Sequence, residues 1–269
     1  MQKTIAFIGA GNMSRAFIVG LLQSGFDPKN IWASSPTIAK HNELNALSIH
    51  TTTNNAEAAA HADIIIFAIK PWVIEAVCVE LKAIIQDKNP LLISLATGIK
   101  TATISALLDN YPVHLVRTMP NIASAVGAGA TGLFANTAVT HAQKIEVEKL
   151  FRATGVAVWV EEENLLDVIT AVSGSGPAYL FYFFEAMQRV GESMGLTAEQ
   201  AKILVSQTAV GAAKMAMERP ESFEDLRRLV TAEKGTTAAA MAVFDQNELK
   251  STVKKAMQAC LARAKELAK

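Results

Sequence analysis

Two glycines near the start of the chain could help to bind a phosphate group. The apolar run Thr4–Ile8 predicts a strand, which passes directly into Gly9-Ala10-Gly11-Asn12-Met13 and then into a helical pattern. Gly9 would let the chain turn sharply, and Gly11 would let a pyrophosphate approach the backbone. The helix that opens near Asn12 would offer N–H groups at the positive end of its dipole. This order of strand, glycine turn and helix favours nucleotide binding over a plain turn.

The end of the second predicted strand indicates which nicotinamide cofactor would bind. In a dinucleotide fold this end meets the adenosine ribose, and a carboxylate there repels a 2′-phosphate. The chain has Ser34-Ser35-Pro36-Thr37 at this place and no carboxylate. Hydroxyl and backbone donors suit a phosphate, so we expect NADPH, with NADH possible. Alternatively, Ser34, Ser35 and Thr37 only cap the following helix.

Three further segments carry polar or flexible residues that could do chemistry. Lys70-Pro71 follows a strand, at the sheet edge where nicotinamide would bind, so Lys70 either supports the cofactor or is a solvated strand-end lysine. Ser173-Gly174-Ser175-Gly176-Pro177 interrupts a helical stretch and either contacts nicotinamide and substrate or forms only a kink. We interpret Glu161–Glu163 as a solvated linker. The histidines are scattered without spaced partners, so we assign no metal site and no catalytic histidine.

Alternating strand and helix signals over residues 1–163 predict the elements that position these residues. Strands are expected at Thr4–Ile8, Ile31–Ser34, Ile64–Ala68, Leu91–Leu95, Val113–Arg117, Val126–Phe134 and Val156–Val160, with a weaker one at Ser48–Thr51. Helices are expected at Met13–Ser24, Thr37–Leu47, Val73–Ile85, Thr101–Leu108 and His141–Ala153. The strands are continuously apolar rather than alternating, which is typical of a parallel sheet covered by helices on both faces. We therefore predict an α/β fold whose N-terminal part is a Rossmann-like doubly wound sheet.

The second part of the chain has a different character. After residue 163 no strand pattern returns, and Ala, Met, Leu, Glu and Lys dominate. We predict an NADP-binding domain over residues 1–163 and an all-helical dimerisation domain over residues 164–269. The stretch Ala198–Glu218 has apolar residues on more than one helix face, so we expect a second copy of the chain to cover it.

Composition excludes several classes of function. Of the 269 residues, 51% are apolar and 19% are charged, which argues against disorder. The formal net charge is zero, so the chain has no global field to attract nucleic acid or an anionic membrane. No apolar stretch is long enough to span a bilayer, and no secretory signal is visible. Cys78 and Cys260 lie far apart and are expected to be buried thiols, which fits a cytoplasmic protein.

Several motifs together resemble one enzyme family over essentially the whole chain. The matching segments are Phe7-Ile8-Gly9-Ala10-Gly11-Asn12-Met13, Ala68-Ile69-Lys70-Pro71, Ser94-Leu95-Ala96-Thr97-Gly98, Arg117-Thr118-Met119-Pro120-Asn121 and Ser173-Gly174-Ser175-Gly176-Pro177-Ala178-Tyr179. In this order and spacing they resemble pyrroline-5-carboxylate reductase, the last enzyme of proline biosynthesis. The resemblance implies an N-terminal NADPH domain and a helical domain that forms an intertwined dimer, with larger rings of dimers common.

The resemblance also implies cofactor contacts beyond the glycine turn. It assigns contacts to Ser34, Pro36 and Asn55, and to the turns Ala68–Pro71 and Ala96–Gly98. Together with the residue-based interpretations above, the expected cofactor-binding residues are Gly9, Gly11, Asn12, Met13, Ser34, Ser35, Pro36, Asn55, Ala68, Lys70, Pro71, Ala96 and Gly98.

The implied reaction transfers a hydride to the imine carbon of 1-pyrroline-5-carboxylate and a proton to its nitrogen, giving L-proline. Gly235-Thr236-Thr237 opens a predicted helix, Thr237–Phe244, whose N–H groups could bind the substrate carboxylate. The resemblance assigns the proton relay to Thr237; on residues alone, Thr236 and Thr237 could be only a helix cap. The chain has Ala232-Glu233-Lys234 where the family usually has Ser-Pro-Gly, and Arg228 where it has Asp.

Two alternatives stay open, one because it shares the two-domain architecture and the other because of the altered residues 232–234. One is a related imine reductase or β-hydroxyacid reductase, and the other is a catalytically inactive NADP-binding paralogue.

Overall fold

The computed structural model describes residues 3–37 and 44–267. Its packing divides the chain into two compact units, one of residues 1–177 with 260–269 and one of residues 178–259. The predicted helix Thr37–Leu47 falls largely on residues 38–43, which lie outside the described residues. The boundary expected between residues 163 and 164 stays a prediction.

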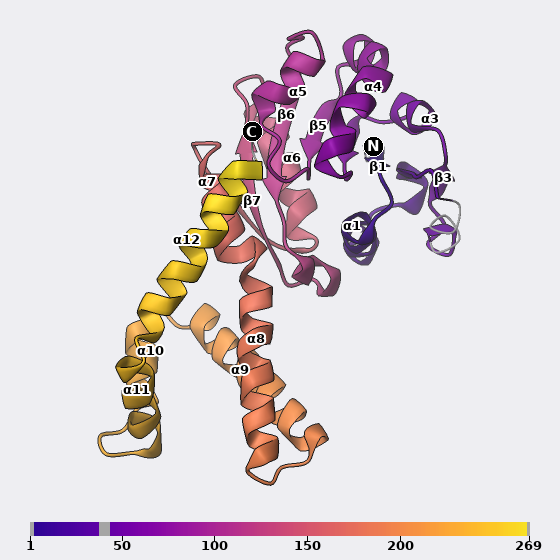
Figure 1. Cartoon of the computed structure of the whole chain (residues 1–269). Helices are drawn as coiled ribbons and strands as arrows, with labels where there is room; N and C mark the ends of the chain where they lie inside the picture. The colour runs from indigo at the N-terminus through magenta and orange to yellow at the C-terminus, as the bar shows by residue number, and fades with distance from the viewer. Residues whose placement is uncertain (1–2, 38–43, 268–269) are drawn as a thin grey trace. The chain divides into compact units, whose positions relative to one another are not determined.

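An eight-stranded sheet forms the centre of the first unit (Figure 1). Its order is β3-β2-β1-β4-β5-β6-β7-β8, and β6 with β7 is the antiparallel pair among parallel neighbours. The strands are β1 (Ile5–Ile8), β2 (Ile31–Ser34), β3 (His50–Thr52), β4 (Ile64–Phe67), β5 (Leu91–Ser94), β6 (His114–Met119), β7 (Gly129–Ala135) and β8 (Gly155–Trp159). The predicted doubly wound sheet is confirmed. β7 starts three residues later than expected, because residues 122–126 form a 3₁₀ turn.

Helices cover both faces of this sheet. The helices of the first unit are α1 (Asn12–Gln23), α3 (Asn55–Ala60), α4 (Ile74–Lys88), α5 (Thr101–Leu107), α6 (His141–Arg152) and α7 (Leu165–Ile169). Short helical turns are η1 (Pro28–Asn30), η2 (Pro71–Val73), η3 (Ile122–Val126) and the π turn η4 (Thr170–Gly174). The sequence pattern did not predict α3, which has six residues and therefore less than two turns of periodicity.

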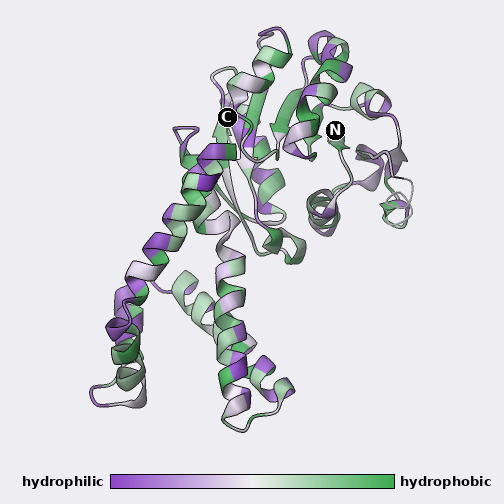
Figure 2. Ribbon diagram, in the orientation of Figure 1, coloured by the Kyte–Doolittle hydropathy of each residue, from purple (hydrophilic) through white to green (hydrophobic). Residues whose placement is uncertain are grey.

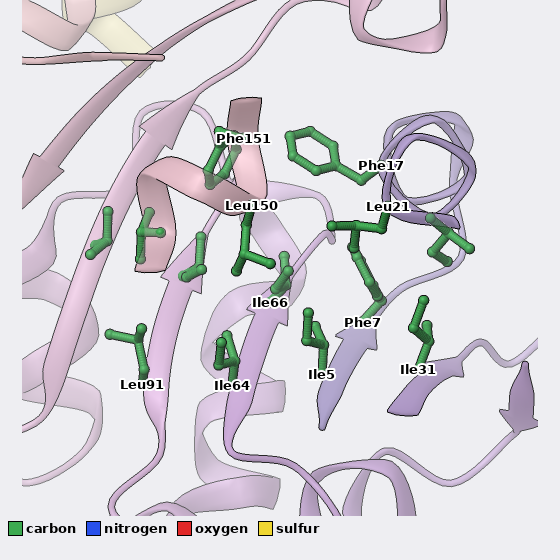
Figure 3. Close-up of a cluster of buried hydrophobic side chains, with 14 of the residues drawn as sticks. Ile5, Phe7, Phe17, Leu21, Ile31, Ile64, Ile66, Leu91, Leu150 and Phe151 are labelled. Carbon is green, nitrogen blue, oxygen red and sulfur yellow. The ribbon is translucent and has the colours of Figure 1, made fainter. Parts of the chain in front are cut away.

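The strands β1, β2, β4, β5 and β6 contribute to two hydrophobic cores, which explains their continuous apolar runs. Ile5 and Phe7 of β1 pack into one core with residues of α1 and α6, shown in Figure 3. There the rings of Phe17 and Phe151 meet edge to face with centroids 4.7 Å apart. Ala6 and Ile8 point to the opposite core, which α3, α4 and α5 cover. Side chains alternate across a strand, so a sheet buried on both faces needs apolar residues at every position.

The acidic run Glu161–Glu163 is only in part the solvated linker that the sequence predicted. Glu161 and Glu162 are exposed, but Glu163 accepts hydrogen bonds from the backbone N–H and hydroxyl of Thr101, at 2.7 and 2.9 Å. The guanidinium of Arg117, 5% exposed, lies 3.3 Å from Glu163 and 3.2 Å from Asp167. The prediction was wrong for Glu163 because a buried cation in β6 recruits carboxylates from a distant segment, and spacing does not reveal such a partner.

The second unit is entirely helical over its described residues. α8 (Gly176–Ser193) leads into it, α9 (Ala198–Glu218), α10 (Phe223–Leu229) and α11 (Thr236–Gln246) follow, and α12 (Leu249–Leu267) leads out of it. α9 begins with a capping box between Thr197 and Gln200. None of the described helices is both long and apolar enough to span a membrane.

This helical unit exposes large apolar side chains. Leu180, Phe181 and Tyr182 of α8 are 57%, 63% and 78% exposed, and Ile203 and Leu204 of α9 are 59% and 56% exposed. Figure 2 shows hydrophobic residues along these helices. The aromatic side chains of α8 are therefore not the core of a single chain, and the unit has an apolar surface to cover.

Candidate functional site

The turn between β1 and α1 has the geometry of an anion cradle. Gly9 has φ +103°, its N–H donates to the carbonyl of Ser34 at 3.0 Å, and its carbonyl accepts from the buried hydroxyl of Ser14 at 2.5 Å. A Cβ on Gly9 would lie 2.5 Å from the carbonyl oxygen of Ala68, whereas a Cβ on Gly11 would meet nothing within 4 Å. The first glycine therefore packs the turn against β4, and the second leaves space above the backbone.

The N-terminus of α1 points its backbone N–H donors, which a phosphate needs, into the open space above Gly11. Gly11 is its N-cap in extended conformation, no side chain caps the helix, and no acidic residue lies in its first turn. The first-turn N–H groups and the positive end of the dipole are thus available to an anion. A dinucleotide pyrophosphate fits this arrangement, because its charge meets donors and its approach meets no side chain.

A cavity of about 840 Å³ lies above the turn, in the first unit. Of the residues expected to bind cofactor, those that line it are Gly9, Gly11, Asn12, Met13, Ser35, Pro36, Ala68, Lys70 and Pro71. They come from the carboxyl ends of β1, β2 and β4, where ligands of open α/β sheets bind. The structure thus brings together segments that lie up to 62 residues apart (from residue 9 to residue 71).

Four of the expected cofactor residues do not line this cavity, and their role stays a prediction. Ser34 is fully buried, and its hydroxyl donates to the side-chain oxygen of Asn55 at 2.7 Å. Asn55 in turn donates to Glu80 of α4 at 2.8 Å. Ala96 is 1% exposed, and Gly98 has φ +82° in the turn that follows β5. Through these contacts Ser34 and Asn55 hold the end of β2 in place.

Among the described residues that follow β2, those that line the cavity carry no carboxylate. Ser35, Pro36 and Thr37 line it, and the backbone N–H of Thr37 donates to the hydroxyl oxygen of Ser35 at 3.2 Å. An adenosine ribose at this position would meet hydroxyl and backbone groups. This surface does not repel a 2′-phosphate, as expected for NADP.

The sequence reasoning did not single out several residues that line the same cavity. They include Trp72, Thr97, Asn121 and Ile122, and Thr97 was covered only within the turn Ala96–Gly98. Each follows the carboxyl end of β4, β5 or β6. The rule that placed Lys70 at the crevice applies equally to these strand ends and could have found them.

Asn121 fixes one wall of the cavity. This residue is 7% exposed, and its side-chain NH₂ donates to the carbonyl of Ser173 at 2.9 Å. Its oxygen accepts from the backbone N–H groups of Ala123 and Ala130. Gly174 also lines the cavity, and a Cβ there would lie 2.6 Å from the terminal carbon of Met119.

The interrupted helix around Ser173–Gly174 is therefore a π turn that packs on the cavity wall. The N–H of Ser175 donates to the carbonyl of Thr170 at 2.8 Å, five residues back. π turns inside helices occur often at functional sites. The helix is interrupted as predicted, and Gly174 of the turn lines the cavity, but contact of this segment with nicotinamide and substrate stays a prediction.

The expected substrate residues lie in the second unit, at the start of α11. Gly235 is the N-cap, and Thr236 and Thr237 are the first two helical residues, so neither threonine caps the helix. No side chain caps α11, and none of its first-turn residues is acidic. Thr237 is half-buried, and Thr236 is exposed. Their substrate role stays a prediction.

Lys234, just before α11, stands where the resemblance predicts glycine, and its backbone conformation is one that glycine favours. Lys234 has φ +61°, in the left-handed region that glycine adopts without strain. Glu233 and Lys234 are exposed. Arg228 lies 2.6 Å from Glu224 and 3.5 Å from Asp225, so its charge is balanced on α10 itself.

No nucleophilic cysteine or metal cluster emerges from the described residues. Burial raises the pKa of the Cys78 thiol to about 12, so this thiol stays protonated in the folded chain. Cys260, which was expected to be buried, is half-buried, and its sulfur lies 3.3 Å from the hydroxyl of Ser175. Within residues 3–37 and 44–267, no three His, Cys, Asp or Glu side chains gather as a metal site would require.

Two family models match the chain. One, described as pyrroline-5-carboxylate reductase dimerisation, matches residues 163–267, and another, described as NADP oxidoreductase, coenzyme F420-dependent, matches residues 4–98.

Curated proteins match over the full length. A pyrroline-5-carboxylate reductase of Vibrio alginolyticus is 42% identical over 100% of this chain and 98% of its own. One of Haemophilus influenzae is 41% identical over 99% of this chain and 98% of its own.

Solved structures of the same enzyme are also similar to this chain over its full length. A pyrroline-5-carboxylate reductase of Coxiella burnetii is 43% identical, with a TM-score of 0.95 over 100% of both chains. A pyrroline carboxylate reductase of Plasmodium falciparum, solved with NADP bound, is 27% identical, with a TM-score of 0.89 over 100% of this chain and 99% of that one.

Proposed function

The chain belongs to the pyrroline-5-carboxylate reductase family, and we propose how its own residues carry out the reduction of 1-pyrroline-5-carboxylate to L-proline. It is an NADP-dependent oxidoreductase of proline biosynthesis that self-associates through its helical part. Full-length similarity at 41–42% identity and the uncapped glycine turn below a large cavity support this function together.

The first unit binds and orients the cofactor in this proposal. NADPH supplies the hydride that reaches the imine carbon. Gly11 and the first turn of α1 receive the pyrophosphate, and Ser35 with Thr37 receives the 2′-phosphate. Lys70, exposed at the end of β4, adds a positive charge beside the phosphates. Ser34 and Asn55 act through their mutual hydrogen bond, which fixes the end of β2.

The start of α11 binds the substrate in this proposal. The N–H groups of Thr236 and Thr237 neutralise the ring carboxylate at the positive end of the helix. Gly235 contributes as the extended N-cap, because its own N–H donates to the carbonyl of Ala232 at 3.0 Å. When the substrate is a neutral imine, the hydroxyl of Thr237 donates a hydrogen bond to the ring nitrogen and relays to it a proton that water replaces. When the substrate is a protonated iminium, the hydroxyl accepts a hydrogen bond from the ring N–H and transfers no proton. A threonine hydroxyl is a weak acid, so the substrate enters as a protonated iminium or takes its proton through water.

Three finer assignments belong to the same proposal. We place the protein in the cytoplasm, because it makes an amino acid and its two cysteines are free thiols. Its partners are the small substrate and further copies of itself, with no nucleic acid or membrane, which the formal net charge of zero supports. The NADP-binding domain covers residues 1–163, and the helical domain covers residues 164–269.

One assay tests the function. The absorbance of reduced nicotinamide is followed with purified protein and 1-pyrroline-5-carboxylate, and separately with cyclic imines and β-hydroxy acids. We expect turnover with 1-pyrroline-5-carboxylate and preference for NADPH over NADH. Turnover only with another substrate would favour a related reductase, and NADPH binding without any turnover would favour an inactive paralogue.

A further inference from the structure

A tryptophan at the rim of the cofactor cavity has most of its surface exposed. Trp72 is 79% exposed and lines the cavity together with the turn Gly9–Met13. It lies in η2, directly after Lys70 and Pro71. A tryptophan side chain has a large apolar surface, and leaving it in water forgoes the stabilisation that burial would give. Because Trp72 lines the cavity, its indole offers a large flat apolar surface to a ligand bound there.

The short turn that carries Trp72 is held firmly. The N–H of Val73 donates to the carbonyl of Lys70 at 2.9 Å, and Pro71 restricts the backbone between them. The next residue, Ile74, is 3% exposed and anchors α4 in the core. The indole is thus displayed from a fixed backbone, so little backbone entropy is lost when it contacts a ligand.

The two other tryptophans have partners within the protein. The ring of Trp32 stacks between His50 and His61, with both centroid distances 4.5 Å. Trp159 donates from its indole N–H to Glu148 at 3.2 Å, and the ammonium of Lys144 lies 5.4 Å from its ring centroid. Across residues 3–37 and 44–267, no ring contact or hydrogen bond of the Trp72 side chain is found.

We propose that Trp72 is a cofactor-binding residue whose indole ring lies against the NADPH dinucleotide at the mouth of the cavity and shields it from water. The proposal deepens the proposed function and rests on it. The occupant is the cofactor because Trp72 shares its cavity with the phosphate cradle, and because Lys70 beside it complements phosphate charge. Aromatic rings stack on any nucleotide base, and a flat indole needs no particular hydrogen-bonding edge.

Binding of NADPH to the whole protein, measured by isothermal titration calorimetry, tests the proposal. Trp72→Ala should raise the Kd for NADPH about tenfold, and Trp72→Phe, which keeps an aromatic ring, should raise it less. Val79→Ala is the matched control, because Val79 is a 59% exposed apolar residue of α4 that does not line the cavity, and its Kd should equal that of wild type. An unchanged Kd in Trp72→Ala would overturn the proposal.

A second readout does not depend on activity or on the alanine variant. Acrylamide should quench tryptophan emission of the wild-type protein, and saturating NADP⁺ should reduce this quenching because it covers Trp72. In Trp72→Phe the remaining tryptophans should show no such protection. Equal protection in both proteins would contradict the proposal. Failure of wild type to bind NADPH at all would instead contradict the proposed function.

Discussion

Gly9 and Gly11 belong to one turn but meet different constraints. Gly9 has a positive φ and touches the carbonyl of Ala68, so its lack of a side chain serves the fold. Gly11 has an extended backbone and open space where a Cβ would point, so its lack of a side chain leaves room for the expected ligand. The motif predicts a sharp turn at Gly9 and approach of a pyrophosphate at Gly11, and the structure adds which neighbours each glycine meets.

Replacement of Gly9 by Ala should therefore lower stability, whereas replacement of Gly11 by Ala should lower cofactor affinity. Gly9→Ala should lower the free energy of unfolding by about 1–3 kcal/mol through backbone strain, and more through the clash with Ala68. Gly11→Ala should leave the thermal unfolding of the apo protein near wild type and raise the Kd for NADPH at least about tenfold. Thermal melts and calorimetry measure both, and equal stability losses in the two variants would contradict this division.

The hydroxyls at the end of β2 should also differ in role. Replacing both Ser34 and Ser35 with Ala should weaken NADPH more than NADH. Ser35→Asp alone should weaken NADPH by about tenfold or more, because a carboxylate in the cavity repels the 2′-phosphate, and should spare NADH. Ser34→Ala is the comparison, since its buried hydroxyl contacts Asn55 and should affect both cofactors alike. If the ratio of the Kd values for NADPH and NADH were unchanged in all variants, the residues at the end of β2 would not determine the preference for NADP.

Thr237 should affect turnover more than cofactor binding. Thr237→Ala should lower kcat about 100-fold, in the range of a lost general acid, while the Kd for NADPH stays near wild type. Thr237→Ser, which keeps the hydroxyl, should restore most of the rate. Equal losses in kcat and in NADPH affinity would assign Thr237 a structural role at the start of α11.

At the scale of elements, β6 holds the segment that follows the last strand, β8, against the sheet. Arg117 of this strand holds Glu163 and Asp167, and Glu163 also holds the start of α5 through Thr101. Asn121, two residues after β6, lines the cavity and donates a hydrogen bond to the carbonyl of Ser173 in the π turn. This buried ion network therefore positions elements that border the cavity.

Removing the buried cation should be costly. Arg117→Leu leaves two carboxylates without their partner, so it should lower the free energy of unfolding by about 3–5 kcal/mol in urea titrations. Arg152→Leu is the control, because Arg152 pairs with Glu148 on the surface at 66% exposure and should cost less than about 1 kcal/mol. A loss of similar size in the two variants would mean that burial of the Arg117 network adds nothing.

At the scale of the whole molecule, the two units differ in how they satisfy their apolar residues. The first unit buries them in two cores on either side of a sheet. The helical unit leaves α8 and α9 with exposed apolar side chains and an apolar groove of about 620 Å³ lined from α8, α9 and α10. Self-association supplies the missing cover, in agreement with the dimerisation model that matches this region.

A charge on this surface should weaken assembly. Leu204→Glu should lower the molar mass found by light scattering after gel filtration, because it places a carboxylate in an apolar contact. Lys202→Glu adds the same residue at an exposed polar position of α9 and should leave the mass unchanged. An unchanged mass in Leu204→Glu would mean that this part of α9 lies outside the contact between copies.

The sequence by itself determined the strands, the glycine turn and the family. Buried parallel strands and a strand–glycine–helix turn are local patterns, written in consecutive residues, and they placed most of the sheet and the residues from Gly9 to Met13 that line the cavity. Tertiary structure decided that Glu163 turns inward to Arg117 and that the Ser34 hydroxyl faces Asn55. Burial and pairing depend on which distant segments meet, and no local spacing encodes that choice.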